Sequence, residues 1–250
     1  MMEREQYCEH CEFCELNGLD AMRREFSANV SHELKTPITS IAGFAEMIES
    51  GMVESPEDCR LFAGRIVRES SRLLALVEDI MHLSRLDEES FPDLTPCSLA
   101  EVAEECIQFL RPLALSAEVT LRQEGAAPPP ILGHRALLRE LVQNLCENAI
   151  KYNHPGGHVW VKLDCAGDYA VLEVADDGIG IAPEHLDRIF QRFYRVDKSR
   201  SKQTGGTGLG LSIAKHITEQ HKGTIAVRSQ LGAGTAFAVS LPLASPGDTE

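Results

Sequence analysis

Hydrophobic positions between Ala21 and Ser50 recur at alternating spacings of four and three residues. This spacing is typical of a helix that packs along a coiled-coil seam. We therefore expect one long helix over residues 21–50. The seam consists of Val30, Leu34, Pro37, Ile41, Phe44 and Ile48.

A second long helix is predicted from Ser55 to about Leu86. It begins with a capping hydroxyl, a proline and two acidic residues, which are typical signals for a helix start. Both helices carry apolar faces too large for one hairpin to bury, so two hairpins are expected to pair into a dimeric four-helix bundle. The apolar stripe of the second helix is Ile66, Leu73, Leu76, Val77 and Ile80.

The pattern after a polar, proline-bearing stretch alternates between helical and extended segments, which indicates a second domain from near Ser98. Helices are predicted over residues 99–117 and 134–152, with an extended segment at 119–123. Two antiparallel strand pairs are predicted, 158–164 with 169–175 and 223–229 with 235–241. The expected fold class is α+β, a helical hairpin followed by an α/β sandwich. The expected limits are a tail at 1–20, a dimerisation domain at 21–90, a linker at 91–97, the second domain at 98–243 and a tail at 244–250.

The formal net charge of −14 argues against nucleic acid as a partner. The one concentrated basic run, Arg195 to Lys202, falls in a predicted loop. No stretch approaches the ~20 uninterrupted apolar residues of a membrane span, and the N-terminus lacks the apolar segment of a signal peptide. We therefore expect no membrane contact by this segment.

The eight cysteines fall into two groups. Cys8, Cys11 and Cys14 have the spacing of half a zinc knuckle, and His10 could complete four ligands, but all crowd one short segment. A tail without metal is the expected state, with zinc binding as the alternative. The others are expected to be reduced, as in a cytosolic protein, because they are scattered singly: Cys59, Cys97, Cys106, Cys146 and Cys165.

His32 is the first residue with candidate chemistry. It lies two residues from both Val30 and Leu34, so at roughly 100° per residue its side chain should point away from the bundle axis into solvent. A partner protein could reach it there. On this evidence alone, however, an exposed histidine on a helix is more often a solvated polar side chain.

The neighbours of His32 extend this chemistry. Glu33 could accept the imidazole proton and so sharpen the nucleophile at the other nitrogen, while Thr36 follows one turn later on the same face. Pro37 removes one helical hydrogen bond, so the helix should bend beside the histidine.

The predicted helix over residues 134–152 has a polar arc opposite its apolar one. Amide oxygens one turn apart, with a lysine nearby, suit magnesium and phosphate, although a solvated face is the alternative. The polar arc consists of Glu140, Asn144, Asn148 and Lys151.

Two glycine-bearing segments could contact a nucleotide. In DDGIGI, residues 176–181, a carboxylate at a strand end could accept a hydrogen bond from an exocyclic amine, although such a segment is most often a plain turn. In GGTGLGLSI, residues 205–213, glycines precede an amphipathic helix whose free amides suit phosphate. This second segment is neither a Walker loop nor a dinucleotide fingerprint.

Taken together, the segments resemble the sequence boxes of two-component sensor histidine kinases. FSANVSHELKTP at 26–37 resembles the H-box, NLCENAIKY at 144–152 the N-box and DDGIGI the G1 box. FQRFYR at 190–195 resembles the F-box, and GGTGLGLSI the G2 box. All five occur in family order from about Arg23 to Pro242.

This resemblance implies a Bergerat-type ATP-binding domain, with ATP and Mg2+ as cofactors. It implies that His32 takes the phosphoryl group with the help of Glu33 and passes it to an aspartate of a response-regulator receiver. Thr36 falls where the family places a residue that positions water for dephosphorylating the regulator, so dual kinase and phosphatase activity is expected.

The resemblance also assigns the nucleotide contacts. Asn148 is implied as the magnesium ligand and Asp176 as the reader of the adenine amine. Asp177 stands where Asn is commoner, which leaves the magnesium geometry less well defined. The other implied contacts are Asn144, Lys151, Tyr152, Gly178, Gly180, Arg195, Gly206, Gly208 and Gly210.

Two other classes stay open: an ATP-binding switch or scaffold without catalysis, and a GHKL-type chaperone or topoisomerase fragment. The second class would resemble this chain only from Ser98 onward, and the first would not need competent residues at every matched position. We expect the cytoplasmic portion of a longer, membrane-bound sensor, because no sensing segment is present. Transfer within or between subunits is left open.

Overall fold

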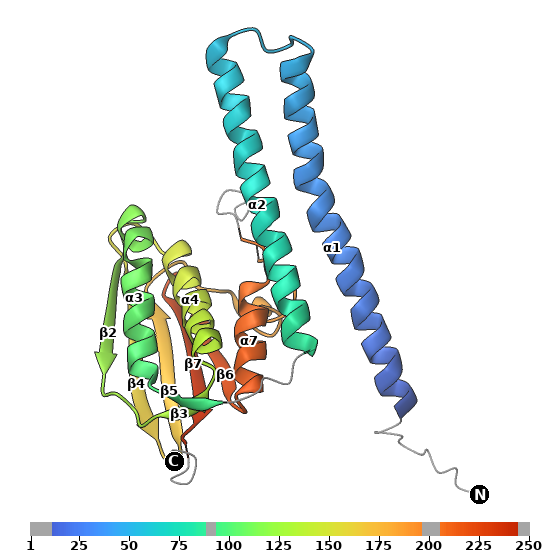
Figure 1. Ribbon diagram of the computed structural model, residues 1–250. Coiled ribbons are helices and arrows are strands. Elements are labelled where there is room, and N and C mark those ends of the chain that lie inside the picture. Colours follow the sequence, from blue (N-terminus) through green and yellow to red (C-terminus); the bar gives the residue numbers. More distant parts are fainter. Residues whose placement is uncertain (1–11, 89–93, 197–205, 245–250) are drawn as a thin grey trace, which may run out of the picture. The chain divides into compact units, whose positions relative to one another are not determined.

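The computed structural model describes residues 12–88, 94–196 and 206–244 (Figure 1). The side chains of residues 12–25 lie outside this description. The chain divides into two compact units, Met1–Glu78 and Asp79–Glu250, and each is considered by itself. Of the candidate zinc ligands, Cys8, His10 and Cys11 lie outside the described residues, and only the backbone of Cys14 is described.

The first unit contains a helical hairpin. Helix α1 spans Glu12–Glu49, and helix α2 begins at Pro56 and ends, within the second unit, at Glu88. The start of α2 has the predicted cap, because the Ser55 hydroxyl oxygen accepts the Asp58 backbone N–H at 3.0 Å. Gly51 in the connecting turn has a φ of +70°, which glycine adopts at no steric cost.

Helix α1 begins at Glu12 rather than near Ala21, so residues 12–20 are helical where a tail was expected. Gly18 is the one strong helix breaker in that segment and costs only about 1 kcal/mol relative to alanine. Because extending an existing helix is far easier than nucleating one, α1 continues through it. The predicted bend at Pro37 stays a prediction.

The second unit is built on a five-stranded sheet in the order β2-β4-β5-β7-β6. Strand β2 (Thr120–Gly125) pairs in parallel with β4 (His158–Ala166), and the other neighbours are antiparallel. The two predicted strand pairs are confirmed. They are β4 with β5 (Tyr169–Asp176), and β6 (Thr224–Gln230) with β7 (Gly234–Pro242).

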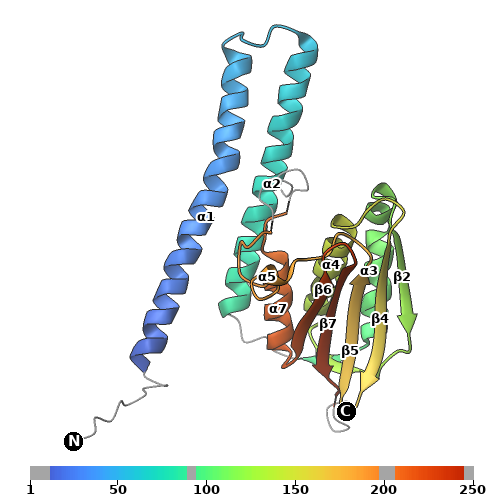
Figure 2. The ribbon, with the colours of Figure 1, turned by 180° about the vertical axis from the view of Figure 1, so that it is seen from behind.

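Three helices cover one face of this sheet, as Figure 2 shows from the opposite side. They are α3 (Leu99–Ser116), α4 (Arg135–Lys151) and α7 (Gly210–Gln220). The α/β sandwich with one helical face is therefore confirmed. Smaller elements are α5 (Pro183–Leu186) and a pair formed by β1 (Thr95–Cys97) and β3 (Ile131–Gly133).

Helix α4 lies at the centre of the core. Its predicted apolar arc is confirmed, since Leu138, Leu141, Val142 and Leu145 have no exposed surface. Full burial of each large aliphatic side chain stabilises the fold by about 1.5–3 kcal/mol before entropy is counted. This burial fixes the rotation of α4 and so the direction of its polar arc.

Five cysteines are free in the described part of the chain: Cys59, Cys97, Cys106, Cys146 and Cys165. Burial raises the pKa of the Cys106 thiol to about 12, which makes it unreactive at neutral pH. None of the helices in the described ranges has both the length and the apolar character that crossing a membrane requires.

Candidate phosphoacceptor and nucleotide sites

His32 lies on α1 with 78% of its side chain exposed, as the seam predicts. Its Nδ1 atom is 3.9 Å from Oε1 of Glu33, so the carboxylate is close to one nitrogen of the ring. Thr36 lies one turn further on, and its hydroxyl donates a hydrogen bond to the His32 carbonyl oxygen at 3.2 Å. The imidazole is thus presented to solvent with an acid at one nitrogen.

Glu33 has a second partner that the sequence did not reveal. Its Oε2 atom lies 3.6 Å from Nη2 of Arg72 on α2, and the Arg72 side chain is only 13% exposed. Arg72 also lies 4.0 Å from Glu69. Because α2 carries several arginines at similar spacing, only the packing of the hairpin identifies the one that faces Glu33.

The polar arc of α4 meets the glycine segment that precedes α7. A Cβ atom on Gly210 would lie 2.8 Å from Oδ1 of Asn144, and one on Gly206 would lie 2.8 Å from Nζ of Lys151. A side chain at either position would have to displace the polar group of Asn144 or Lys151. The structure therefore brings the predicted residues of the two boxes together, while Gly205 lies outside the described residues.

Asn148 and Tyr152 complete the C-terminal part of this arc. Asn148 is half-buried on α4, one turn after Asn144. The Lys151 ammonium lies 5.9 Å from the centre of the Tyr152 ring, within reach of a cation–π contact. The amide oxygen of Asn148 is the kind of ligand that magnesium prefers.

Asp176 ends β5, and its carboxylate is held by the backbone. Its Oδ1 atom accepts the N–H groups of Gly178 at 2.9 Å and Thr235 at 3.3 Å. Burial raises the pKa of Asp176 to about 6, although these two hydrogen bonds oppose the shift. The described hydrogen bonds of this carboxylate use Oδ1, so Oδ2 can receive a ligand donor.

The two predicted glycines after Asp176 have steric roles. A Cβ atom on Gly178 would lie 2.5 Å from the Tyr152 carbonyl oxygen, and Gly180 has a φ of +67°. The Ile179 N–H donates to the same Tyr152 oxygen at 3.1 Å. The turn after Asp176 is therefore packed directly against the end of α4.

Gly208 joins the F-box segment to the start of α7. Its carbonyl oxygen accepts the Phe193 N–H at 2.9 Å, and its φ is +79°. A Cβ atom at this position would lie 3.0 Å from the Phe193 backbone and 3.3 Å from the Arg195 side chain. Arg195 is thus beside the glycine segment.

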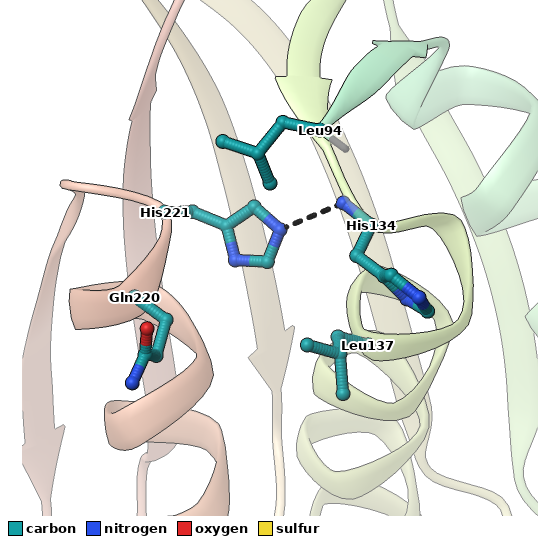
Figure 3. Close-up of a pocket in the computed structure, with 5 residues that line it drawn as sticks. All are labelled: Leu94, His134, Leu137, Gln220 and His221. Atoms are coloured by element: carbon teal, nitrogen blue, oxygen red, sulfur yellow. Dashed lines mark hydrogen bonds between the residues drawn. The ribbon is translucent and has the colours of Figure 1, made fainter. Parts of the chain in front are cut away.

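A small cavity of about 60 Å³ lies between the start of α4 and the end of α7 (Figure 3). Nε2 of His221 accepts the His134 backbone N–H at 3.0 Å, and Nδ1 lies 2.7 Å from the Ile217 carbonyl oxygen. This pattern holds a neutral imidazole with the proton on Nδ1. The lining residues are Leu94, His134, Leu137, Gln220 and His221.

The buried His221 makes the second unit sensitive to acid. Burial lowers the pKa of His221 below its ordinary value of 6.5, so the unfolded chain takes up the proton first as pH falls. The stability that this residue contributes is complete above pH 6.5 and is lost below it. The substitution His221→Ala should lower the free energy of unfolding by about 1–3 kcal/mol at pH 7.5.

Urea unfolding of both proteins at pH 7.5 and 5.5 checks this prediction. The difference in stability between wild type and His221→Ala should shrink at the lower pH. An equal difference at both pH values would contradict a role for the neutral ring.

Two family models match this chain. Residues 22–89 match the family model of the His Kinase A (phospho-acceptor) domain. Residues 133–245 match that of the histidine kinase-, DNA gyrase B- and HSP90-like ATPases.

The similar curated proteins are named sensor kinases. The sensor-like histidine kinase SenX3 of Mycolicibacterium smegmatis is 38% identical over 90% of this chain and 58% of its own length. The sensor histidine kinase RppB of Synechocystis is 37% identical over 89% of this chain and 50% of its own length. The chain therefore spans little more than half the length of these relatives.

Solved structures share the fold. The histidine kinase AdeS of Acinetobacter baumannii has a TM-score of 0.69 at 24% identity, covering 86% of this chain and 98% of that one. The histidine kinase ThkA, in complex with the response regulator protein TrrA, has a TM-score of 0.72 at 23% identity, covering 94% of this chain and 68% of that one.

These matches define a histidine phosphoacceptor domain followed in the chain by an ATPase domain of the histidine kinase, DNA gyrase B and HSP90 type. The chain belongs to the sensor histidine kinases of two-component systems. A chaperone or topoisomerase fragment is excluded, because residues 22–89 match the phosphoacceptor model.

Proposed function

We propose that this chain is an ATP-dependent autokinase that phosphorylates His32. The observation that carries the proposal is the exposed His32 imidazole beside the Glu33 carboxylate, in the same chain as an ATPase fold. Glu33 near Nδ1 favours the tautomer with the proton on that atom. Nε2 then holds the lone pair that attacks the γ-phosphorus.

The reaction is an in-line phosphoryl transfer. A bond forms between His32 Nε2 and the γ-phosphorus while the bond to the oxygen of the leaving ADP breaks. The phosphorylated ring would be positively charged if it kept its Nδ1 proton, and Glu33 is placed 3.9 Å away to accept it. The product is a neutral imidazole ring with one phosphoryl group on Nε2.

ATP would bind between α4 and the turns that follow β5 and precede α7. Asp176 would accept the adenine amine, and Lys151, Arg195 and the amides at the start of α7 would face the phosphates. The close approach of Gly206 and Gly210 to α4 supports this, because a side chain there would fill the phosphate cradle. The further nucleotide contacts in this proposal are Asn144, Tyr152, Gly178, Gly180 and Gly208.

Asn148 would hold Mg2+ through its amide oxygen, together with phosphate oxygens of the nucleotide. When bound, the ion supplies positive charge that offsets the negative charge of the transferring group. The half-buried position of Asn148 on the polar arc fits this donor set.

A homodimer is the proposed assembly. The hairpin exposes large apolar side chains that one copy does not cover, among them Ile38 at 52%, Val67 at 64% and Leu74 at 63%. Burying this surface against a second hairpin would form the four-helix bundle. We also propose that the assembly is the cytoplasmic part of a longer, membrane-bound sensor. The names of the relatives support the sensor role.

The proposed acceptor of the phosphoryl group is an aspartate in a response-regulator receiver domain, with regulator phosphatase activity as a second function. Thr36 on the exposed face near His32 supports the latter, because its hydroxyl could position water.

A test loads the chain with labelled phosphate from ATP and Mg2+, removes the nucleotide, and adds purified receiver domains one by one. Label should leave the chain and appear on one receiver as a base-labile acyl phosphate. Label that stays on the chain with every receiver would contradict the relay.

Arg72 should assist autophosphorylation through Glu33. Its replacement in Arg72→Ala removes the ion pair to Oε2, and autophosphorylation should slow about two- to fivefold, as expected for a partly exposed ion pair of up to about 1 kcal/mol. Initial rates with saturating ATP measure the effect. Arg72→Lys should recover part of the rate, and Arg68→Ala, one turn earlier and exposed, should leave it unchanged. An equal decrease of the autophosphorylation rate in Arg68→Ala would indicate that alanine substitutions damage α2 in general.

A further inference from the structure

Asp177, next to the proposed adenine reader, contacts His158 through both of its carboxylate oxygens. Oδ1 accepts the His158 backbone N–H at 2.6 Å, and Oδ2 lies 3.1 Å from Nδ1 of the same His158. Burial raises the pKa of Asp177, but the hydrogen bonds from His158 and Asn153 outweigh it and hold the pKa below its ordinary value. Asp177 is therefore ionised, and His158 Nδ1 carries the proton between them.

The same two residues are tied together through the backbone. The Asp177 N–H donates to the His158 carbonyl oxygen at 3.3 Å, and the Asn153 side-chain amide donates to that oxygen at 3.0 Å. Nε2 of His154 lies 3.1 Å from the Asp177 carbonyl oxygen. These contacts join three segments: the loop after α4, the first residue of β4 and the turn after β5.

Gly157 packs closely against this network. A Cβ atom on Gly157 would lie 2.1 Å from Oδ1 of Asn153 and 2.9 Å from Oδ1 of Asp177. Asp176 precedes Asp177 directly, and its Oδ1 accepts the N–H of Gly178, which follows Asp177. Any rotation of the backbone at Asp177 would therefore move the Asp176 carboxylate.

We propose that His158 and Asp177 form a clamp that positions Asp176 for adenine recognition, so that Asp177 is a positioning residue and not a magnesium ligand. The proposal rests on the ATP binding proposed above. The contacts with His158 engage both oxygens of Asp177 and direct the carboxylate toward the first residue of β4.

The clamp would also accommodate an asparagine at position 177. An asparagine would keep the acceptor for the His158 backbone N–H. Its side-chain amide would donate to His158 Nδ1 once the histidine moved its proton to Nε2. The second hydrogen bond would be reversed rather than lost.

The test measures ADP binding to the full chain by titration calorimetry, once with Mg2+ and once with EDTA. His158→Ala and Asp177→Ala should each weaken ADP binding about three- to tenfold, in both conditions alike, as expected for loss of a partly exposed charged hydrogen bond. The double variant should bind no more weakly than Asp177→Ala alone, because the His158 side chain acts only through the Asp177 carboxylate. His158→Asn and Asp177→Asn should stay within about twofold of wild type, because each retains a hydrogen-bond partner.

A matched control is Lys162→Ala, on the same strand, where Lys162 pairs with Glu173 at 3.3 Å on β5. It should bind ADP as wild type does, and thermal unfolding of every variant shows that the fold is retained. If Asp177→Ala weakened ADP binding only in the presence of Mg2+, Asp177 would be a magnesium ligand and the clamp would be overturned. Wild-type binding by His158→Ala would overturn it as well. If the wild-type chain itself bound no ADP, the proposed ATP binding would be wrong. Normal ADP binding by wild type together with either of the two results above would contradict the clamp alone.

Discussion

Replacing His32 by glutamine should lower ATP-dependent phosphorylation of this chain at least about a thousandfold. Glutamine keeps a polar side chain on the exposed face of α1 but has no nitrogen lone pair that can attack phosphorus. The acid-labile, alkali-stable label that phosphohistidine gives should therefore disappear. Label from γ-labelled ATP and Mg2+, quantified after acid and after alkali treatment, measures the effect.

A neighbouring variant provides the control for this experiment. Ser31→Ala removes an exposed hydroxyl that hydrogen-bonds the Ser27 carbonyl oxygen at 2.9 Å, and it should label as wild type does. ADP affinity should be the same in His32→Gln and wild type, because His32 lies outside the ATPase domain. Normal ADP binding without label in wild type would instead support an ATP-binding switch or scaffold.

Replacing Asp176 by alanine should weaken ADP binding by about 30- to 100-fold, since the partly buried, charged carboxylate that we propose as acceptor of the adenine amine is lost. The wild-type affinity should also fall as pH drops through about 6, because burial raises the pKa of Asp176 to about 6 and only the ionised carboxylate accepts this hydrogen bond without a competing proton. Above that pH the carboxylate is charged and the affinity contributed by Asp176 is complete.

Asp176→Asn is the matched variant for the pH dependence. Its amide oxygen can still accept a hydrogen bond, but the amide does not titrate. The difference in ADP affinity between Asp176→Asn and wild type should therefore be largest above pH 7 and smallest near pH 5. Comparing the two proteins cancels the protonation of the nucleotide itself. A constant difference across this range would contradict a titrating Asp176 at the adenine site.

Much of the site could be predicted from sequence because its positions follow helix periodicity. The seam on α1 fixes the outward direction of His32, and the apolar arc of α4 fixes where Asn144, Asn148 and Lys151 point. Each of these predictions needs only the geometry of one helix and one buried face.

The contacts that sequence could not predict depend on pairing between distant elements. Arg72 reaches Glu33 across the hairpin, and His158 reaches Asp177 between the ends of two strands. No local pattern marks either pair. The short strands β1 and β3, with three residues each, give too few positions to show alternation. The parallel pairing of β2 with β4 likewise depends on tertiary packing.

The most direct test of the central claim is to locate the phosphoryl group. The chain is incubated with ATP and Mg2+, digested with trypsin at alkaline pH, and the peptide covering residues 25–35 is fragmented by electron-transfer mass spectrometry. This peptide contains His32 together with Ser27 and Ser31. The account predicts the phosphoryl mass on His32 and its loss after brief acid treatment. An acid-stable phosphoryl group on either serine, or an unmodified peptide from chain that binds ATP, would contradict it.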